Sequence, residues 1–160
     1  MTTTNSLPAT GLTLTKHQIL QGAVISGVIN AVINGAIQYF LLRKSMPMPL
    51  TVDSIGTETH TVLGSSVPLA VSLAMILTAV AHFTVKGAKK PFVPTTLWLV
   101  IKHGLFAFGA VVALAVVWQR AMGTVEVGLG SAVVLLALVA GLAAAIVNYM
   151  TITAVVEEQA

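Results

Sequence analysis

Three amide side chains lie four residues apart within an otherwise apolar stretch: Asn30, Asn34 and Gln38. At about 100° per residue they share one helix face with the small residues Gly27 and Ala31. An unpaired amide in hydrocarbon costs roughly several kcal/mol, so this face needs polar partners. Two interpretations remain open. The amides form contacts between helices, or they line a path and replace part of a solute's hydration shell.

A second face of the same kind lies near the end of the chain. It combines an amide, Asn148, and a hydroxyl, Thr151, with the small residues Ala137, Ala140, Gly141, Ala144 and Ala145. Small residues allow two helix backbones to approach closely in a membrane. We therefore expect this face to pack against the amide face of the first helix. Asn148 then either pairs with that face or lines the same path.

Three ionisable side chains lie inside apolar stretches, where such groups indicate function by default: His82, Lys102 and His103. We expect them at similar depth near the cytoplasmic side, as a cluster that sets charge selectivity or pH response. Histidine titrates near neutral pH, which permits a proton relay or an anion site. Lys102 alone is also explained by snorkelling to the headgroups. The spacing does not require His17 as a third metal ligand, so we expect neither a metal nor a cofactor.

Catalytic motifs are not found in the sequence. It has no cysteine, no serine-nucleophile or metalloprotease motif, and no carboxylate within an apolar stretch. Asp53, Glu58 and His60 lie in a polar connection, where such residues are usually helix caps and turn formers; binding of a divalent cation is the alternative. We therefore expect a protein that is not an enzyme.

Composition defines the class of protein that must hold these side chains. Of 160 residues, 56% are hydrophobic and 8% are charged, whereas soluble domains average about 25% charged residues. The sequence therefore predicts an integral membrane protein. The formal charge of +3 is too small to indicate that the protein binds nucleic acid. The N-terminus lacks the pattern of a cleaved signal peptide, so we expect the first helix to be retained.

The apolar stretches predict an all-α, polytopic membrane protein with a four-transmembrane-helix bundle at residues 16–156. The expected helices are 16–42, 62–85, 95–120 and 127–155, with a flexible tail at 1–15 and a short tail at 157–160. Trp98 and Trp118 lie 20 residues apart, which is about 30 Å along a helix and equals the hydrocarbon thickness. They are expected to mark the two aromatic belts.

Basic residues predict the orientation. Four spans place both termini and the second connection on one side, with Lys16, Lys86, Lys89, Lys90 and Lys102 there and Arg43, Lys44 and Arg120 opposite. This excess favours cytoplasmic termini, and we expect the inner membrane of a bacterium. Lys-His pairs at 16–17 and 102–103 also suggest two parallel helix hairpins, a repeat found in some transporters, although chance explains the match equally well.

Three functions are consistent with these patterns. The first is a small permease or channel-like protein for a small polar solute or ion, with Asn30, Asn34, Gln38 and Asn148 along the path. The second is a non-transporting accessory or assembly subunit of a membrane complex. The third is a membrane redox or metal-binding protein. The two small-residue faces favour a homo-oligomer or a larger complex within the lipid bilayer.

Overall fold

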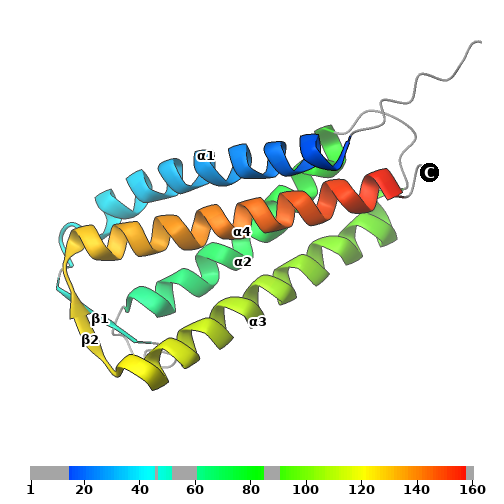
Figure 1. Ribbon diagram of the computed structural model, residues 1–160. Coiled ribbons are helices and arrows are strands. Elements are labelled where there is room, and N and C mark those ends of the chain that lie inside the picture. Colours follow the sequence, from blue (N-terminus) through cyan, green and yellow to red (C-terminus); the bar gives the residue numbers. More distant parts are fainter. Residues whose placement is uncertain (1–14, 46, 52–60, 85–90, 158–160) are drawn as a thin grey trace, which may run out of the picture.

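Four long helices and a two-stranded ribbon make up the computed structural model, which describes residues 15–45, 47–51, 61–84 and 91–157 (Figure 1). The elements are α1 (Lys16–Leu42), β1 (Met48–Leu50), α2 (Val62–Thr84), the turn η1 (Phe92–Thr96), α3 (Leu97–Met122), β2 (Val125–Val127) and α4 (Leu129–Glu157). The predicted all-α class with four helices is confirmed. The predicted tail at 1–15 lies outside the described residues, except for Thr15. Residue 85, the last of the predicted second helix, also lies outside them.

Local signals explain where the helices begin and end. Thr15 caps α1 in a capping box, because its Oγ1 accepts from the Gln18 backbone N–H while the Gln18 side chain accepts from the Thr15 backbone N–H. Helix α3 starts two residues later than predicted, after the kinked turn η1, in which Val93 is extended. It ends at Gly123, whose φ of 71° is easily adopted only by glycine.

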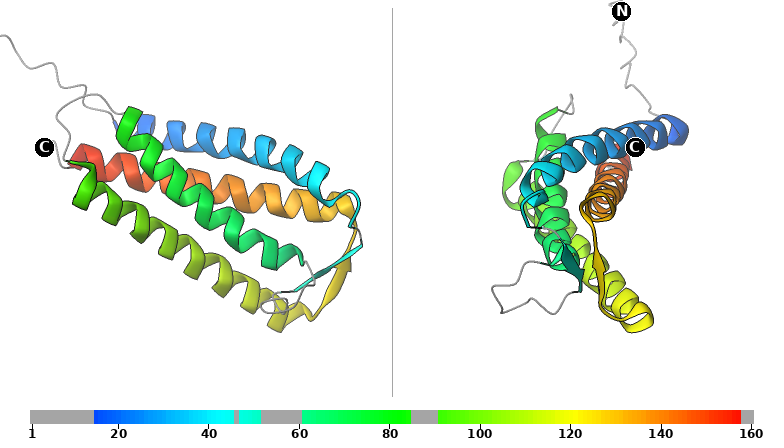
Figure 2. Two further views of the ribbon diagram at one scale, coloured as in Figure 1. Left: turned by 180° about the vertical axis from the view of Figure 1, so that it is seen from behind. Right: turned by 90° about the vertical axis from the view of Figure 1, so that its left-hand side faces the viewer.

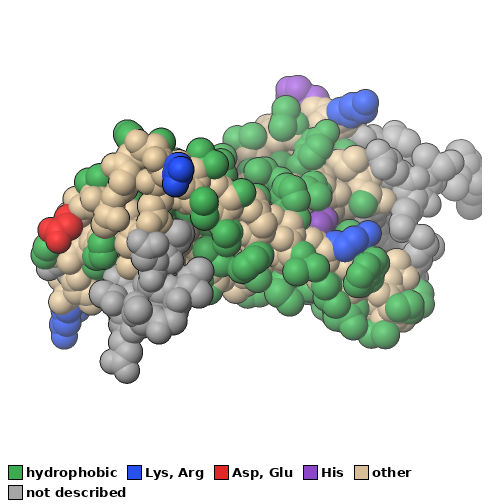
Figure 3. Space-filling model, turned by 90° about the horizontal axis from the view of Figure 1, so that it is seen from below, with side chains coloured by type: hydrophobic (Ala, Val, Ile, Leu, Met, Phe, Trp, Pro, Cys, Tyr) green, Lys and Arg blue, Asp and Glu red, His purple; other side chains and the backbone are tan. Residues whose placement is uncertain are grey.

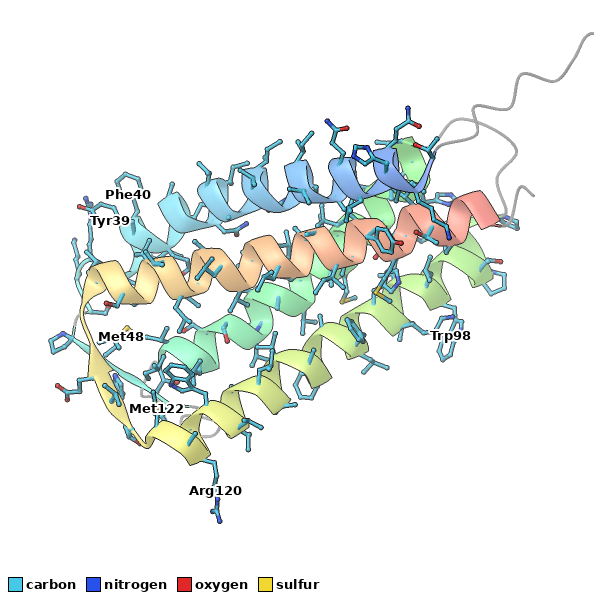
Figure 4. All side chains as sticks on the ribbon, viewed as in Figure 1. Tyr39, Phe40, Met48, Trp98, Arg120 and Met122 are labelled. Atoms are coloured by element: carbon cyan, nitrogen blue, oxygen red, sulfur yellow. The ribbon has the colours of Figure 1, made fainter. Side chains whose placement is uncertain are left out.

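All four helices are long and apolar enough to cross a membrane. Their outward surfaces are apolar: along α1 the exposed side chains include Val24, Val28, Val32, Phe40 and Leu41. Trp98 is 58% exposed and Trp118 44% exposed, and Figure 4 shows Trp98 pointing away from the neighbouring helices. Such a surface suits lipid rather than water, so the chain is an integral membrane protein.

The helices form an open row rather than a closed ring. Extensive contacts join α1 to α4, α4 to α2, and α2 to α3, whereas α3 and α4 barely touch. Figure 2 shows α2 and α4 in the middle of the row, with α1 and α3 outside. Helix α1 begins and α4 ends at one end of the molecule, the terminal end. The opposite end carries the β1–β2 ribbon and is called the ribbon end (Figure 1).

The chain consists of two interlocked hairpins, α1-β1-α2 and α3-β2-α4. Strands β1 and β2 pair in antiparallel fashion, with Met48 opposite Val127 and Leu50 opposite Val125. The two helices of each hairpin barely touch each other, and both pack on helices of the other hairpin. Exchanging α1 with α3 and α2 with α4 maps these main contacts onto one another. This is the pattern of a parallel two-plus-two repeat.

The Lys-His pairs that suggested a repeat are not at equivalent positions. Lys16 is the first residue of α1, whereas Lys102 is the sixth residue of α3. The repeat lies in the order and packing of the elements, and the sequence match does not mark it. The ribbon itself was not predicted, because strands of three residues are too short to produce a periodic pattern.

Small residues bring α1 and α4 together, as the two faces predicted. A methyl group added to Gly27 would lie 2.8 Å from the carbonyl oxygen of Gly141, and one added to Gly35 would lie 3.2 Å from Ala137 Cβ. Backbones this close exclude larger side chains between them. Large side chains pack instead at the ribbon end, where Leu42, Leu50, Val62 and Leu136 are among the buried residues.

Candidate functional site

The amides of α1 are used within their own helix. Asn30 Nδ2 donates to the Ser26 carbonyl oxygen and Asn34 Nδ2 to the Asn30 carbonyl oxygen, each at 2.9 Å. Both side chains are half-buried, and Gln38 is 9% exposed. Together with the close approach of Gly27 to Gly141, this geometry favours the packing interpretation. A solute path along α1 stays a prediction.

Asn148 does not pair with the amides of α1, contrary to the expected contact. Its Oδ1 is buried and has no hydrogen-bond partner within the described parts of the chain. The physical reason lies in α1. The side-chain N–H groups of Asn30 and Asn34 donate to carbonyl oxygens four residues earlier in their own helix. These bonds require no change in the close distance between α1 and α4.

His103 of α3 is buried among hydroxyl groups from the two inner helices. Its Nδ1 lies 2.8 Å from Thr78 Oγ1 of α2 and 3.4 Å from Thr151 Oγ1 of α4, and only 3% of the residue is exposed. His103, Thr78 and Thr151 each lie six residues from the end of their helix, or about 9 Å from the terminal end. One turn deeper the same three helices meet through Ala74, Ala107 and Val147.

The Thr78 hydroxyl connects His103 to the backbone of α2. Thr78 Oγ1 lies 2.8 Å from His103 Nδ1 and also 2.8 Å from the Ala74 carbonyl oxygen, to which it donates. These contacts hold the His103 ring against α2.

His82 contacts a different threonine from His103 at the same end of the molecule. Its Nδ1 lies 2.8 Å from Thr96 Oγ1 just before α3, and its ring contacts Phe83 and Phe92 edge-on. His82 is one helical turn closer to the terminal end than Thr78, or about 6 Å. A joint role of His82 with Lys102 and His103 stays a prediction, whereas Lys102 and His103 share a site.

Lys102 and His103 line a cavity of about 600 Å³ between α3 and α4 near the terminal end. The opposite wall is α4, which contributes Tyr149, Met150 and Thr153. The Thr153 hydroxyl is buried and unpaired within the described residues. Ligand cavities in proteins typically measure about 300–1,000 Å³, so this one is large enough for a small molecule.

Two smaller, apolar hollows continue this cavity toward the ribbon end. Their volumes are about 130 and 190 Å³. Phe106 lines both the large cavity and the first hollow, and Val111, Leu114 and Val139 line both hollows. We call this continuous depression the α3–α4 groove. Figure 3 views the molecule from the α3 side, where hydrophobic side chains predominate and basic and histidine side chains are few.

In residues 15–45, 47–51, 61–84 and 91–157, no three His, Asp or Glu side chains come together as a metal site would require. Asp53, Glu58 and His60, the alternative cation ligands, lie outside the described residues.

The threonines that contact the two histidines were not predicted. The spacing in the sequence could have indicated them. Thr78 precedes His82 by one helical turn, and Thr96 precedes His103 by two turns. When the two helices run antiparallel, the threonine of each can therefore contact the histidine of the other.

No protein-family model matches the sequence, no curated protein is similar to it, and no solved structure matches its fold. The function proposed below rests on the side chains of the α3–α4 groove.

Proposed function

We propose that this chain is a small permease-like membrane protein that binds an amphipathic molecule in the α3–α4 groove. The observation that carries the proposal is that a mostly apolar cavity with a few polar side chains joins a depression that is apolar throughout. Lys102, His103, Tyr149 and Thr153 supply the polar end, and the hollows beyond Phe106 supply the apolar end. Ligand sites typically combine apolar walls with a few placed polar groups in this way.

The cavity lies within the second hairpin, between α3 and α4, and borders the first hairpin at His103. His103 belongs to the second hairpin and its partner Thr78 to the first. Beyond them Ala74, Ala107 and Val147 pack together. We propose that a bound molecule crosses only when the hairpins separate at these three residues.

The solute expected from the sequence was a small polar molecule on a path along α1. The packing of Gly27 on Gly141 leaves that face little room, so the proposed site moves to the other side of α4. The two small-residue faces that favoured a homo-oligomer pack on each other within one chain, so they do not require a second copy. Homo-oligomerisation, the bacterial inner membrane and cytoplasmic termini remain proposals, the last two supported by apolar length and by the excess of basic residues.

A transport assay with a filled cavity tests the permease-like function. The full chain is reconstituted in liposomes, and transbilayer movement of fluorescent single-chain amphiphiles is measured. Met150→Trp places a large ring in the cavity and is expected to reduce movement at least about ten-fold, by loss of the bound state. Met122→Trp is the matched control, because Met122 is exposed at the ribbon end (Figure 4). Equal rates for the two variants, or no movement above empty liposomes, would exclude the proposal.

An accessory or assembly subunit is the second candidate. It is favoured by the same groove, because α3 and α4 leave between them an apolar surface that a partner's helix would cover. This candidate predicts co-purification with a larger membrane complex under mild solubilisation, and no amphiphile movement by the isolated chain. The redox or metal-binding alternative predicts a visible absorption band or bound metal, and a colourless, metal-free preparation would remove it.

A further inference from the structure

The polar end of the α3–α4 groove has the chemistry of an anion site. Eight of the described residues line the large cavity, and none of these eight is acidic. Lys102 brings a positive charge from α3, while Tyr149 and Thr153 bring hydroxyl donors from α4. The unpaired Thr153 hydroxyl gains a partner when an acceptor enters. A phosphate group, with several acceptor oxygens and negative charge, matches this donor set.

The depth of Lys102 places this site at the level of lipid headgroups. Helix α3 has 26 residues and a length of about 39 Å, which exceeds the hydrocarbon thickness by about 4.5 Å at each end. Lys102 is five residues from the start of α3, or about 7.5 Å. A centred α3 would place its Cα about 3 Å inside the hydrocarbon boundary, and belts at Trp98 and Trp118 would place it about 6 Å inside. The four-carbon stem of Lys102 spans either distance to the headgroup region.

The part of the groove from Lys102 to the end of the first hollow is about as long as one leaflet is thick. From Lys102 to Leu114, the last α3 residue that lines the first hollow, the helix rises about 18 Å. Half of the hydrocarbon core is about 15 Å. Small side chains on both walls, Ala110 of α3 and Ala143 of α4, leave space there. An acyl chain that starts from a headgroup at Lys102 would lie along this part of the groove.

We infer that the α3–α4 groove binds one anionic phospholipid. Its phosphate contacts Lys102 and the hydroxyls of Tyr149 and Thr153, and one acyl chain lies between α3 and α4. This assignment rests on the proposed function, because it names the class of amphiphile that the same groove takes. It favours a lipid over a partner's helix because Lys102, the one charged side chain among the described residues that line the groove, lies at headgroup depth.

Lipid binding to the full chain in nonionic detergent tests the headgroup. The probes are phosphatidylglycerol, which is anionic, and phosphatidylcholine, which is zwitterionic, and the readouts are native mass spectrometry and the rise in Tm. Phosphatidylglycerol is expected to bind with one-to-one stoichiometry and to raise Tm by mass action. Lys102→Gln is expected to weaken its binding about five-fold, the effect of one basic residue near a membrane surface. Lys16→Gln, at the start of α1 at the same end, is expected to have no effect.

The acyl chain is tested separately. Ala143→Leu fills the first hollow and is expected to weaken phosphatidylglycerol binding. Ala113→Leu, on the exposed side of α3, is the control. The Tm of each variant without lipid shows whether it is folded, and Ala110→Leu replaces Ala143→Leu if the latter is not.

Each contrary result has its own meaning. Equal binding of the two lipids, or equal effects of Lys102→Gln and Lys16→Gln, would overturn the anionic assignment and leave the proposed amphiphile site intact. Binding of neither lipid, together with no amphiphile movement in liposomes, would overturn both. In an Ala110→Cys variant, cross-linking between two copies that persists when either lipid is added would assign the groove to a second copy of the chain. This result would overturn the inference that a lipid occupies the groove.

Discussion

Gly27 of α1 and Gly141 of α4 approach so closely that a methyl group on Gly27 would lie 2.8 Å from the Gly141 carbonyl oxygen. Because the obstacle is backbone, it cannot rotate away. We predict that Gly27→Ala lowers the free energy of unfolding in detergent micelles by about 1–3 kcal/mol, the cost of overpacking. Unfolding by a denaturing detergent, followed by circular dichroism, measures the change.

Gly22 is the matched control for Gly27 on the same helix. A methyl group added there would meet nothing within 4 Å. Alanine also favours a helix over glycine by up to about 1 kcal/mol, so Gly22→Ala is expected to leave stability equal or slightly higher. Equal losses in the two variants would show that the α1–α4 contact is not formed as described.

The pairing of His103 with Thr78 predicts an energetic coupling between α3 and α2. We predict that a double-mutant cycle of His103→Leu and Thr78→Val gives a coupling of about 0.6–1.7 kcal/mol, the range for hydrogen bonds between helices in membranes. The readout is again the free energy of unfolding. His17→Leu, at the exposed start of α1, is expected to be additive with Thr78→Val within about 0.5 kcal/mol. Additivity in both cycles would contradict the contact.

The register of the ribbon predicts a specific cross-link between the hairpins. Met48 lies directly opposite Val127 in the antiparallel pair, while Val125 is two positions away. Because the natural chain has no cysteine, introduced pairs can be read without background. Met48→Cys with Val127→Cys is expected to form a disulfide on mild oxidation, since facing residues place their Cβ atoms about 4.5–5.5 Å apart.

The off-register pair is the control for this cross-link. Met48→Cys with Val125→Cys is expected to react much more slowly, because diagonal neighbours lie about 7–8 Å apart. Mobility of the bands on a non-reducing gel reports both reactions. Faster reaction of the off-register pair would show that the hairpins meet in a different register.

Water accessibility distinguishes the groove from a path along α1. We predict that a membrane-impermeant maleimide labels Lys102→Cys, which is exposed at the mouth of the cavity, and leaves Asn34→Cys unlabelled. The reason is that Asn34 faces α4 at the level of the close glycine contacts, where little water enters. His17→Cys, exposed at the start of α1, is the positive control. If Asn34→Cys were labelled as fast as His17→Cys, the result would support a water-filled solute path along α1.

The sequence predicted which side chains belong to the candidate site. It did not predict their contacts, because these involve residues of other helices. The intrahelical spacing singled out His82, Lys102 and His103 because ionisable groups are rare in apolar spans. It did not predict that the two histidines contact different threonines, because these contacts depend on how the helices pack. Likewise, the small faces with Gly27 and Gly141 predicted contact between α1 and α4, but not that Asn30 and Asn34 would bond their own helix.

The sequence by itself determined the class, the number of spans and the helix boundaries to within two residues. The physical reason is that the bilayer imposes about 20 apolar residues per span and requires each backbone group to be bonded within its segment. Only the tertiary structure decided that the helices form an open row of interlocked hairpins. That choice depends on close packing between segments distant in sequence. The α3–α4 groove exists because both helices pack on α2 and leave the space between them unfilled.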